Sequence, residues 1–195
     1  MSDRRGVLLE AALRVIARSG VDAATHRAVA AEASVALAST TYHFTSKSDL
    51  IRQALELVIE RSTASVAAHS APPGPDGAEA LVERLVALAE ALASDQRAPL
   101  TAQYELLLEA GRRAELRPLA ERWNDAYMAG IVAMTIRASL PRPELAAEVL
   151  SNVIEGGLLN QLALPRPGFV RESMAEQLRA AVAGLGEAGL PPHAG

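Results

Sequence analysis

Short hydroxyl side chains and one lysine are concentrated between residues 39 and 50 of this 195-residue chain. The segment reads Ser-Thr-Thr-Tyr-His-Phe-Thr-Ser-Lys-Ser-Asp-Leu, and a second polar segment, Thr-His-Arg-Ala-Val-Ala, precedes it at residues 25–30. Hydroxyl groups bond to base edges or to phosphates, and leucine and threonine methyl groups contact the methyl group of thymine. These residue types at this spacing predict a surface that enters a groove of double-stranded DNA.

Short helices must position this surface. A first amphipathic helix is expected over residues 3–18, with Gly20 as its C-cap glycine, and Thr25 can N-cap a second helix. A break anchored by Val35 leads to a third helix over residues 37–43. The second and third helices then form a helix-turn-helix, in which the later helix directs its N-terminal half at base edges.

Buried residues on the third helix and a capped start of the next helix are expected to fix the position of the third helix. Thr40 and Phe44, four residues apart, are expected to face inward, and Ser46 can open a fourth helix with Asp49 as the carboxylate of a capping box. An ordinary corner between two helices is the alternative explanation of this spacing. The helix start at Ser46 and Lys47 favours the DNA-binding explanation.

The same residues resemble the TetR family of transcriptional regulators. The matching pattern is T-x-R-x-V-A, then V, then S-T-T-Y-H-F-x-S-K-x-x-L, with a helix before it and a long helical sequence after it. Two positions depart from the family pattern. Ala36 stands where a serine cap is common, and Leu37 stands where a basic residue is common.

The resemblance implies a homodimer with a helix-turn-helix DNA-binding domain over residues 1–46 and a larger helical ligand-binding and dimerisation domain over residues 47–195. It also implies a small-molecule effector that releases the protein from a pseudo-palindromic operator. By position, the resemblance gives DNA contacts to Thr25 and Arg27 on the second helix, Leu37, Ser39 and Thr41 on the groove face, and Tyr42, His43 and Lys47 at phosphates.

The charge of the chain is unusual for a DNA-binding protein. The net charge is −4, yet residues 1–51 carry six basic and five acidic groups, or +1, and the rest carries 13 against 18, or −5. Phosphate contacts should therefore rely on hydroxyls and backbone amides, with affinity depending on dimerisation. The chain has no cysteine, which excludes disulfides and thiolate metal sites. Without a signal-peptide core or a membrane-spanning segment, a cytoplasmic location is expected.

The remainder of the chain also predicts helices. Apolar residues at helical spacing predict them over residues 78–95, 98–112, 116–139, 142–164 and 169–186. A loop is expected at residues 71–77, where three prolines and two glycines occur. No strand with alternating apolar residues is present. The predicted fold is all-α, with about nine helices.

Polar and aromatic residues within the apolar helices are candidates for an effector pocket. Such pockets have apolar walls and a few polar groups. Core packing is the competing explanation for each aromatic residue, and Glu155 gives only a weak indication of a cationic ligand. The candidates are Gln103, Tyr104, Leu107, Trp123, Tyr127, Met128, Asn152 and Glu155.

The last two long helices are predicted to form a four-helix dimer interface. Gly156 and Gly157 lie in the middle of one of them, which requires a compensating reason such as a close helix approach. Burial within one protomer is the competing explanation. The predicted interface residues are Leu150, Val153, Ile154, Gly157, Leu158, Gln161, Met174, Leu178 and Val182.

Catalysis is not expected. The four histidines lack metal-ligand spacing, no phosphate-binding loop or nucleophile elbow is found, and Glu105 and Glu109 have no partner histidine. No cofactor and no metal is expected. The helix-turn-helix pattern and the resemblance to the TetR family together imply a ligand-responsive transcriptional regulator, most simply a repressor. The alternative is a helical ligand-binding or protein-interaction module with a vestigial DNA-binding element.

Overall fold

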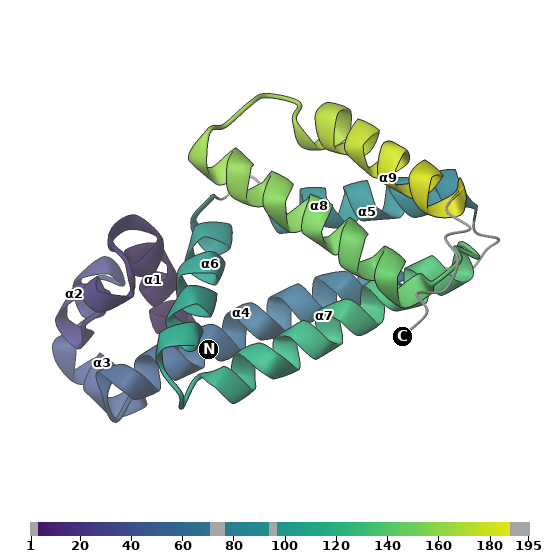
Figure 1. Ribbon diagram of the computed structural model, residues 1–195. Coiled ribbons are helices and arrows are strands. Elements are labelled where there is room, and N and C mark those ends of the chain that lie inside the picture. Colours follow the sequence, from purple (N-terminus) through teal and green to yellow (C-terminus); the bar gives the residue numbers. More distant parts are fainter. Residues whose placement is uncertain (1–3, 71–76, 94–96, 188–195) are drawn as a thin grey trace. The chain divides into compact units, whose positions relative to one another are not determined.

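The computed structural model describes residues 4–70, 77–93 and 97–187, and every regular element within these ranges is helical (Figure 1). The all-α prediction is confirmed, and the predicted helix ends lie within two residues of the observed ones. The predicted loop at 71–77 lies outside the described residues except for Gly77. The elements are α1 (Arg4–Ser19), η1 (Val21–Ala23), α2 (His26–Glu32), α3 (Leu37–His43), α4 (Lys47–Ser70), α5 (Ala78–Ala93), α6 (Arg97–Arg112), α7 (Arg117–Arg137), α8 (Pro143–Ala163), η2 (Val170–Met174) and α9 (Ala175–Glu187).

The chain divides into two compact units. The first unit contains residues 1–62 and 95–124, and the second contains residues 63–94 and 125–195. Two long helices, α4 and α7, contribute residues to both units. Residues 47–62 and 95–124, both expected in the second domain, belong to the first compact unit.

The first unit holds the helix-turn-helix on one apolar core. α1 packs along α6, and α2 packs between α1 and α3 (Figure 1). Phe44 and Thr40 are buried, as predicted, and Val35 packs against the core from the turn between α2 and α3. Leu50 and Ile51 of α4 enter the same core. The first half of α4 is grouped with the helix-turn-helix because its apolar face completes this core.

The second unit packs α5, α8 and α9 together and also contains the ends of α4 and α7. A side chain at Gly157 would place its Cβ 2.5 Å from the Met174 Cε atom, whereas Gly156 has no neighbour within 4 Å. The predicted close approach at the glycine pair is therefore observed at Gly157, within one protomer.

The predicted helix over 169–186 begins with a π-helical turn, η2. The Met174 N–H donates to the Phe169 carbonyl at 2.9 Å, which is an i to i−5 hydrogen bond. This wider turn lets Phe169 and Met174, five residues apart, both pack towards Gly157 and become buried.

None of the helices within the described ranges combines the length and the hydrophobicity that crossing a bilayer requires.

Candidate nucleic-acid interface

The start of α2 presents two of the predicted DNA contacts to solvent. Thr25 is the N-cap, and its Oγ1 accepts a hydrogen bond from the Ala28 N–H at 3.2 Å. Because a hydroxyl both donates and accepts, Thr25 retains a donor for a phosphate. Arg27 is exposed, and its side chain makes no ion pair or hydrogen bond within the described residues. Its guanidinium is therefore available to an external anion.

The inner face of α3 holds the helix in the core, and its outer face is open to solvent. Thr40 donates to the Leu37 carbonyl at 2.8 Å, and Phe44 fixes the end of the helix in the core. On the outer face, the Tyr42 side chain is 85% exposed and Leu37 is 44% exposed. Thr41 is exposed as well, with its Oγ1 bonded to the Ala38 carbonyl at 3.2 Å. Large side chains on a short helix are thus left open to solvent.

Ser39 and His43 are less accessible than the other α3 candidates. Both are half-buried, and the His43 ring meets the Tyr42 ring edge to face, with 5.1 Å between centroids. The N-cap position Ala36 provides no side-chain hydrogen bond, in agreement with the expected lack of a cap there. The exposed outer face of α3 is therefore formed mainly by Leu37, Thr41 and Tyr42.

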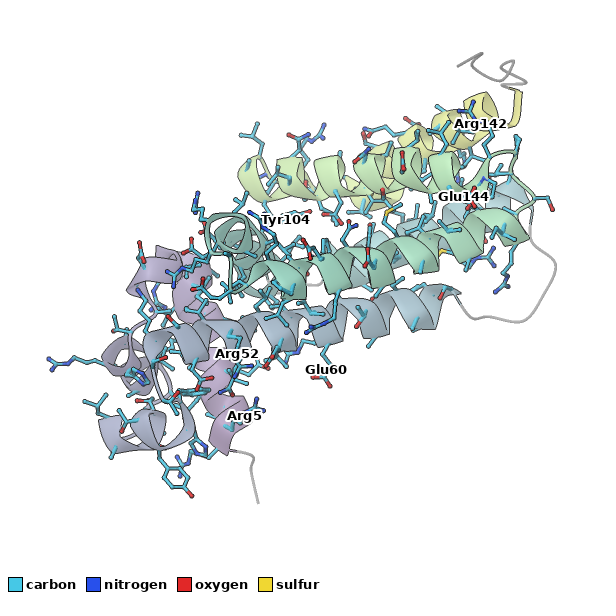
Figure 2. The ribbon with its side chains drawn as sticks, turned by 60° about the horizontal axis from the view of Figure 1, so that its bottom comes forward. Arg5, Arg52, Glu60, Tyr104, Arg142 and Glu144 are labelled. Carbon is cyan, nitrogen blue, oxygen red and sulfur yellow. The ribbon has the colours of Figure 1, made fainter. Side chains whose placement is uncertain are left out.

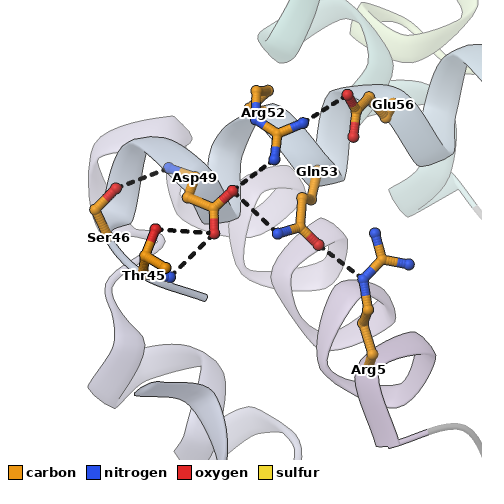
Figure 3. Close-up of polar contacts among 7 residues, drawn as sticks. All are labelled: Arg5, Thr45, Ser46, Asp49, Arg52, Gln53 and Glu56. Carbon is orange, nitrogen blue, oxygen red and sulfur yellow. Dashed lines mark hydrogen bonds and ion pairs between the residues drawn. The ribbon is translucent and has the colours of Figure 1, made fainter. Parts of the chain in front are cut away.

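A polar network fixes the turn between α3 and α4 (Figure 3). The Asp49 N–H donates to the Ser46 hydroxyl at 3.0 Å, which confirms Ser46 as the N-cap. The Asp49 carboxylate accepts from the Thr45 N–H at 3.0 Å, one residue before the cap, and not from the Ser46 N–H that a standard capping box would use. The turn that follows α3 is therefore tied to the first turn of α4.

The same carboxylate connects α4 to α1. Gln53 donates to Asp49 at 3.0 Å and accepts from the Arg5 Nε at 2.7 Å, while Arg52 donates to Asp49 at 2.6 Å. Arg5 and Arg52 extend from the two helices in Figure 2. The bond from Gln53, with those from Thr45 and Arg52, lowers the pKa of Asp49 to about 2.

Lys47 has an internal partner that the sequence pattern does not reveal. Its Nζ atom lies 2.7 Å from the Asp22 carbonyl and 3.3 Å from the Asp22 Oδ1 atom. Arg113, directly after α6, approaches the same Oδ1 atom at 3.9 Å. The side chain of Lys47 is 35% exposed. Asp22 and Arg113 are thus neighbours of the interface that sequence reasoning missed.

Several arginines of the first unit are paired with carboxylates. Arg14 and Arg18 both bond to Glu32, at 2.8 and 3.0 Å, and Arg61 pairs with Glu10. The bonds from Arg14 and then Arg18 lower the pKa of Glu32. These internal pairs reduce the number of cations that can face a phosphate. Arg27 is therefore more important for phosphate binding.

The predicted pocket residues are divided between the two units. Gln103, Tyr104, Leu107 and Trp123 belong to the first unit, and Tyr127, Met128, Asn152 and Glu155 belong to the second. The Trp123 indole N–H donates to the buried Ser62 hydroxyl at 3.0 Å, and Leu107 packs against the core of the first unit.

Within the second unit, Tyr127 and Glu155 interact. Burial, followed by the charge and the hydrogen bond of Glu155, raises the pKa of the Tyr127 phenol. Asn152 is exposed and lies on the opposite side of α8 from the buried Ile154 and Leu158, and its place in a pocket stays a prediction.

Sequence reasoning also missed a surface groove of about 320 Å³ in the second unit. Arg171 and Arg179 border it and pair with Glu90 and Glu79 on α5, each at 2.8 Å. No local pattern reveals this groove because it depends on the packing of α5 against η2 and α9. Its lining residues are Val82, Glu83, Val86, Ala87, Glu90, Arg171, Ala175 and Arg179.

Most residues predicted at the dimer interface are buried within one protomer, where they pack in the second unit. The interface that they would form stays a prediction. Val153 is half-buried, and the Gln161 amide is bonded to the backbone of Arg166 at 2.9 Å through both its oxygen and its nitrogen. The buried residues are Leu150, Ile154, Gly157, Leu158, Met174, Leu178 and Val182.

A different set of residues on α8 and α9 is exposed, and we call it the outer strip. Many of them are small, which permits the close approach of another helix. The strip contains Asn152, Gly156, Leu159, Asn160 and Ala163 on α8, and Gln177, Ala180, Ala183 and Gly184 on α9.

The chain is similar to known regulatory proteins along most of its length. Residues 8–64 match the bacterial regulatory proteins of the tetR family, and residues 76–188 match the tetracyclin repressor-like C-terminal domain. The HTH-type nicotine-responsive transcriptional repressor HdnoR of Paenarthrobacter nicotinovorans is 28% identical over 171 residues, which are 84% of this chain and 86% of that protein.

Solved structures show the same similarity. A TetR family member from Streptomyces coelicolor A3 is 35% identical, with a TM-score of 0.71, over 94% of this chain and 98% of that one. The multidrug binding protein EbrR complexed with ethidium is 33% identical, with a TM-score of 0.67, over 94% and 98% of the two chains. This chain belongs to the TetR family of bacterial regulatory proteins.

Proposed function

We propose that this protein is a homodimeric transcriptional repressor that binds a pseudo-palindromic operator and is released by a small molecule. The observation that carries the proposal is the outer face of α3, where Leu37, Thr41 and Tyr42 are exposed on a helix fastened by Phe44. Apolar and hydroxyl groups on a firmly held helix suit contact with base edges in a major groove.

The eight predicted contacts receive distinct roles in this proposal. Leu37, Ser39 and Thr41 read bases, while Tyr42, His43 and Lys47 contact phosphates at the end of α3 and the start of α4. Thr25 and Arg27 contact the backbone from the start of α2. Arg27 is the strongest phosphate ligand because no carboxylate among the described residues neutralises it.

Fluorescence anisotropy with DNA from upstream of the protein's own gene tests the proposal. We expect salt-sensitive binding by the wild type, and we expect Thr41→Ala to change the preference among operator variants. If no promoter fragment binds at any salt concentration, the repressor proposal is wrong. The chain would then be better described as a ligand-binding module with a vestigial DNA-binding element.

The effector is proposed to be an organic cation. HdnoR is described as nicotine-responsive, and EbrR has been solved with ethidium, proflavin and malachite green. In this chain, Glu155 brings a carboxylate beside the buried Tyr127 in the second unit. We propose that these two residues form the polar end of the effector site, with Met128 contributing apolar contact.

Ethidium is a suitable probe for this site. We expect ethidium to displace operator DNA from the wild type, and Glu155→Gln to weaken ethidium binding about tenfold through loss of a partly desolvated charge contact, about 1.4 kcal/mol. Glu148→Gln, an exposed residue on the same helix, is the control. Equal ethidium affinity in both variants would show that Glu155 is not part of the effector site.

A further inference from the structure

Two cations share one carboxylate oxygen beside the proposed DNA-binding face. The Lys47 ammonium lies 3.3 Å from the Asp22 Oδ1 atom, and the Arg113 guanidinium lies 3.9 Å from that same atom. Lys47 is in the first turn of α4, and Arg113 directly follows α6. Asp22 in η1 therefore connects a proposed phosphate contact with the end of another helix.

The carboxylate of Asp22 and a DNA phosphate are competing anions for Lys47. The Asp22 side chain is 96% exposed, so the carboxylate can leave without opening the core. The Asp22 carbonyl, at 2.7 Å, continues to orient the ammonium, which has three donors. A phosphate that approaches Lys47 also repels the carboxylate, and Arg113 is the cation placed to receive it.

We propose that Asp22 is a regulatory counter-ion, which holds Lys47 in the free protein and passes to Arg113 when Lys47 binds an operator phosphate. This inference rests on the proposed DNA-binding function and concerns its regulation. The exchange conserves charge: Lys47 replaces the Asp22 carboxylate with a phosphate, and Arg113, which already lies near the same carboxylate oxygen, keeps Asp22 as its partner.

The exchange makes DNA binding sensitive to the end of α6. Arg113 is held by an ion pair with Glu109 of α6, whose side chain is only 13% exposed. α6 packs against α1 and η1 within the first unit. A shift of the end of α6 therefore changes the separation of Arg113 from Asp22, and with it the ease of releasing Lys47. By linkage, operator binding must favour the position of α6 that brings Arg113 closer.

Operator affinity in a double-mutant cycle tests this exchange. Because exposed ion pairs are weak, we expect Asp22→Asn to bind operator about two- to fivefold tighter and Arg113→Gln about two- to fivefold weaker. The loss caused by Arg113→Gln should disappear in the Asp22→Asn background, where no carboxylate remains to be received. The gain from Asp22→Asn should likewise disappear in a Lys47→Gln background.

Arg112→Gln is the matched control. Arg112 is the neighbouring arginine and pairs with Glu109 at 3.3 Å, so its removal changes net charge equally. We expect Arg112→Gln to have the same effect in both backgrounds.

Two results of the double-mutant cycle would overturn the proposed exchange. One is unchanged or weaker binding by Asp22→Asn, and the other is an equal loss from Arg113→Gln with and without Asp22. Either result leaves the repressor proposal intact if the wild type binds operator. A wild type that binds no promoter DNA would refute both proposals.

Discussion

At the scale of single residues, the structure separates side chains that fasten the helix-turn-helix from those that face solvent. Thr40 and Phe44 fasten α3, and Asp49 fastens the turn after it. Thr41 and Tyr42, next to Thr40 in sequence, have the opposite role because they lie on the outer face of the helix. The DNA-binding proposal depends on this division between adjacent positions.

Asp49 should make stability depend on pH in the acid range. Its pKa is lowered from 3.8 to about 2, so the folded protein binds this proton less tightly than the unfolded chain does. The stabilisation is fully present above about pH 4 and is lost as the pH falls towards 2, with a magnitude of about 1 kcal/mol after allowing for solvent screening. Urea unfolding of the wild type and Asp49→Asn should show a stability difference at pH 7 that shrinks between pH 4 and pH 2.

The exposed Asp125→Asn is a suitable control for general charge effects. A stability difference for Asp49→Asn that stays constant from pH 7 to pH 2 would contradict the role of the Asp49 carboxylate in the turn.

Arg27 should contribute to binding without reading sequence. We expect Arg27→Gln to weaken all operator variants alike and to reduce the slope of log K against log salt concentration by about 1, as for the loss of one phosphate contact. Anisotropy titrations across a salt series measure this slope. Arg18→Gln, whose arginine is already paired with Glu32, should change the slope less. An equal change from both variants would remove the special role of Arg27.

At the scale of elements, the sequence predicts where helices begin and end but not which neighbours they meet. Thr25, Gly20 and Ser46 are local signals, and the structure places each of them at the predicted helix end. The apolar face of α8 was equally predictable. Its partner was not, because apolar spacing is the same whether a helix packs on its own protomer or on a second copy.

The same limit applies to the candidate site. The hydroxyl-rich pattern is sufficient to locate α3, whereas Asp22 and Arg113 become neighbours of Lys47 only through the packing of η1 and α6. The assignment of Asn152 to the pocket meets the same limit. A polar residue in an apolar segment can lie on either face of its helix.

Gly130 should be required for the contact between α4 and α7. A Cβ at this position would lie 2.1 Å from the Val66 Cγ1 atom, and Val66 is buried and restricted at χ1. We expect Gly130→Ala to lower stability by about 1–3 kcal/mol. Gly111→Ala, in α6 with no neighbour within 4 Å, should raise it by about 0.5–1 kcal/mol. Thermal unfolding that ranks the two variants in the reverse order would contradict this packing.

At the scale of the whole molecule, DNA binding and dimerisation must support each other. The first 51 residues carry only a small positive charge, and several of their arginines are neutralised internally. One helix-turn-helix should therefore bind weakly, while two linked copies on a pseudo-palindromic operator gain from a high effective concentration. Membership of the TetR family supports the dimer. The outer strip of α8 and α9 is the surface that we propose to form it.

Disruption of the outer strip should weaken dimerisation and DNA binding together. Leu159 is 54% exposed, and Leu159→Arg would place a charge in the proposed interface. We expect a shift towards monomer in light scattering and at least a tenfold loss of operator affinity, with the helical content unchanged. Leu108→Arg, an exposed leucine of α6 outside the strip, is the control. An unaltered dimer in Leu159→Arg would exclude the outer strip as the interface.

A hydroxyl-radical footprint on the protein's own promoter tests the central claim most directly. The account predicts two protected half-sites related by a dyad, each read by one α3 helix, and loss of protection on addition of ethidium. Thr41→Ala should alter protection at individual bases without moving the half-sites. Absence of paired half-sites, or protection that is indifferent to every change on the outer face of α3, would contradict the account.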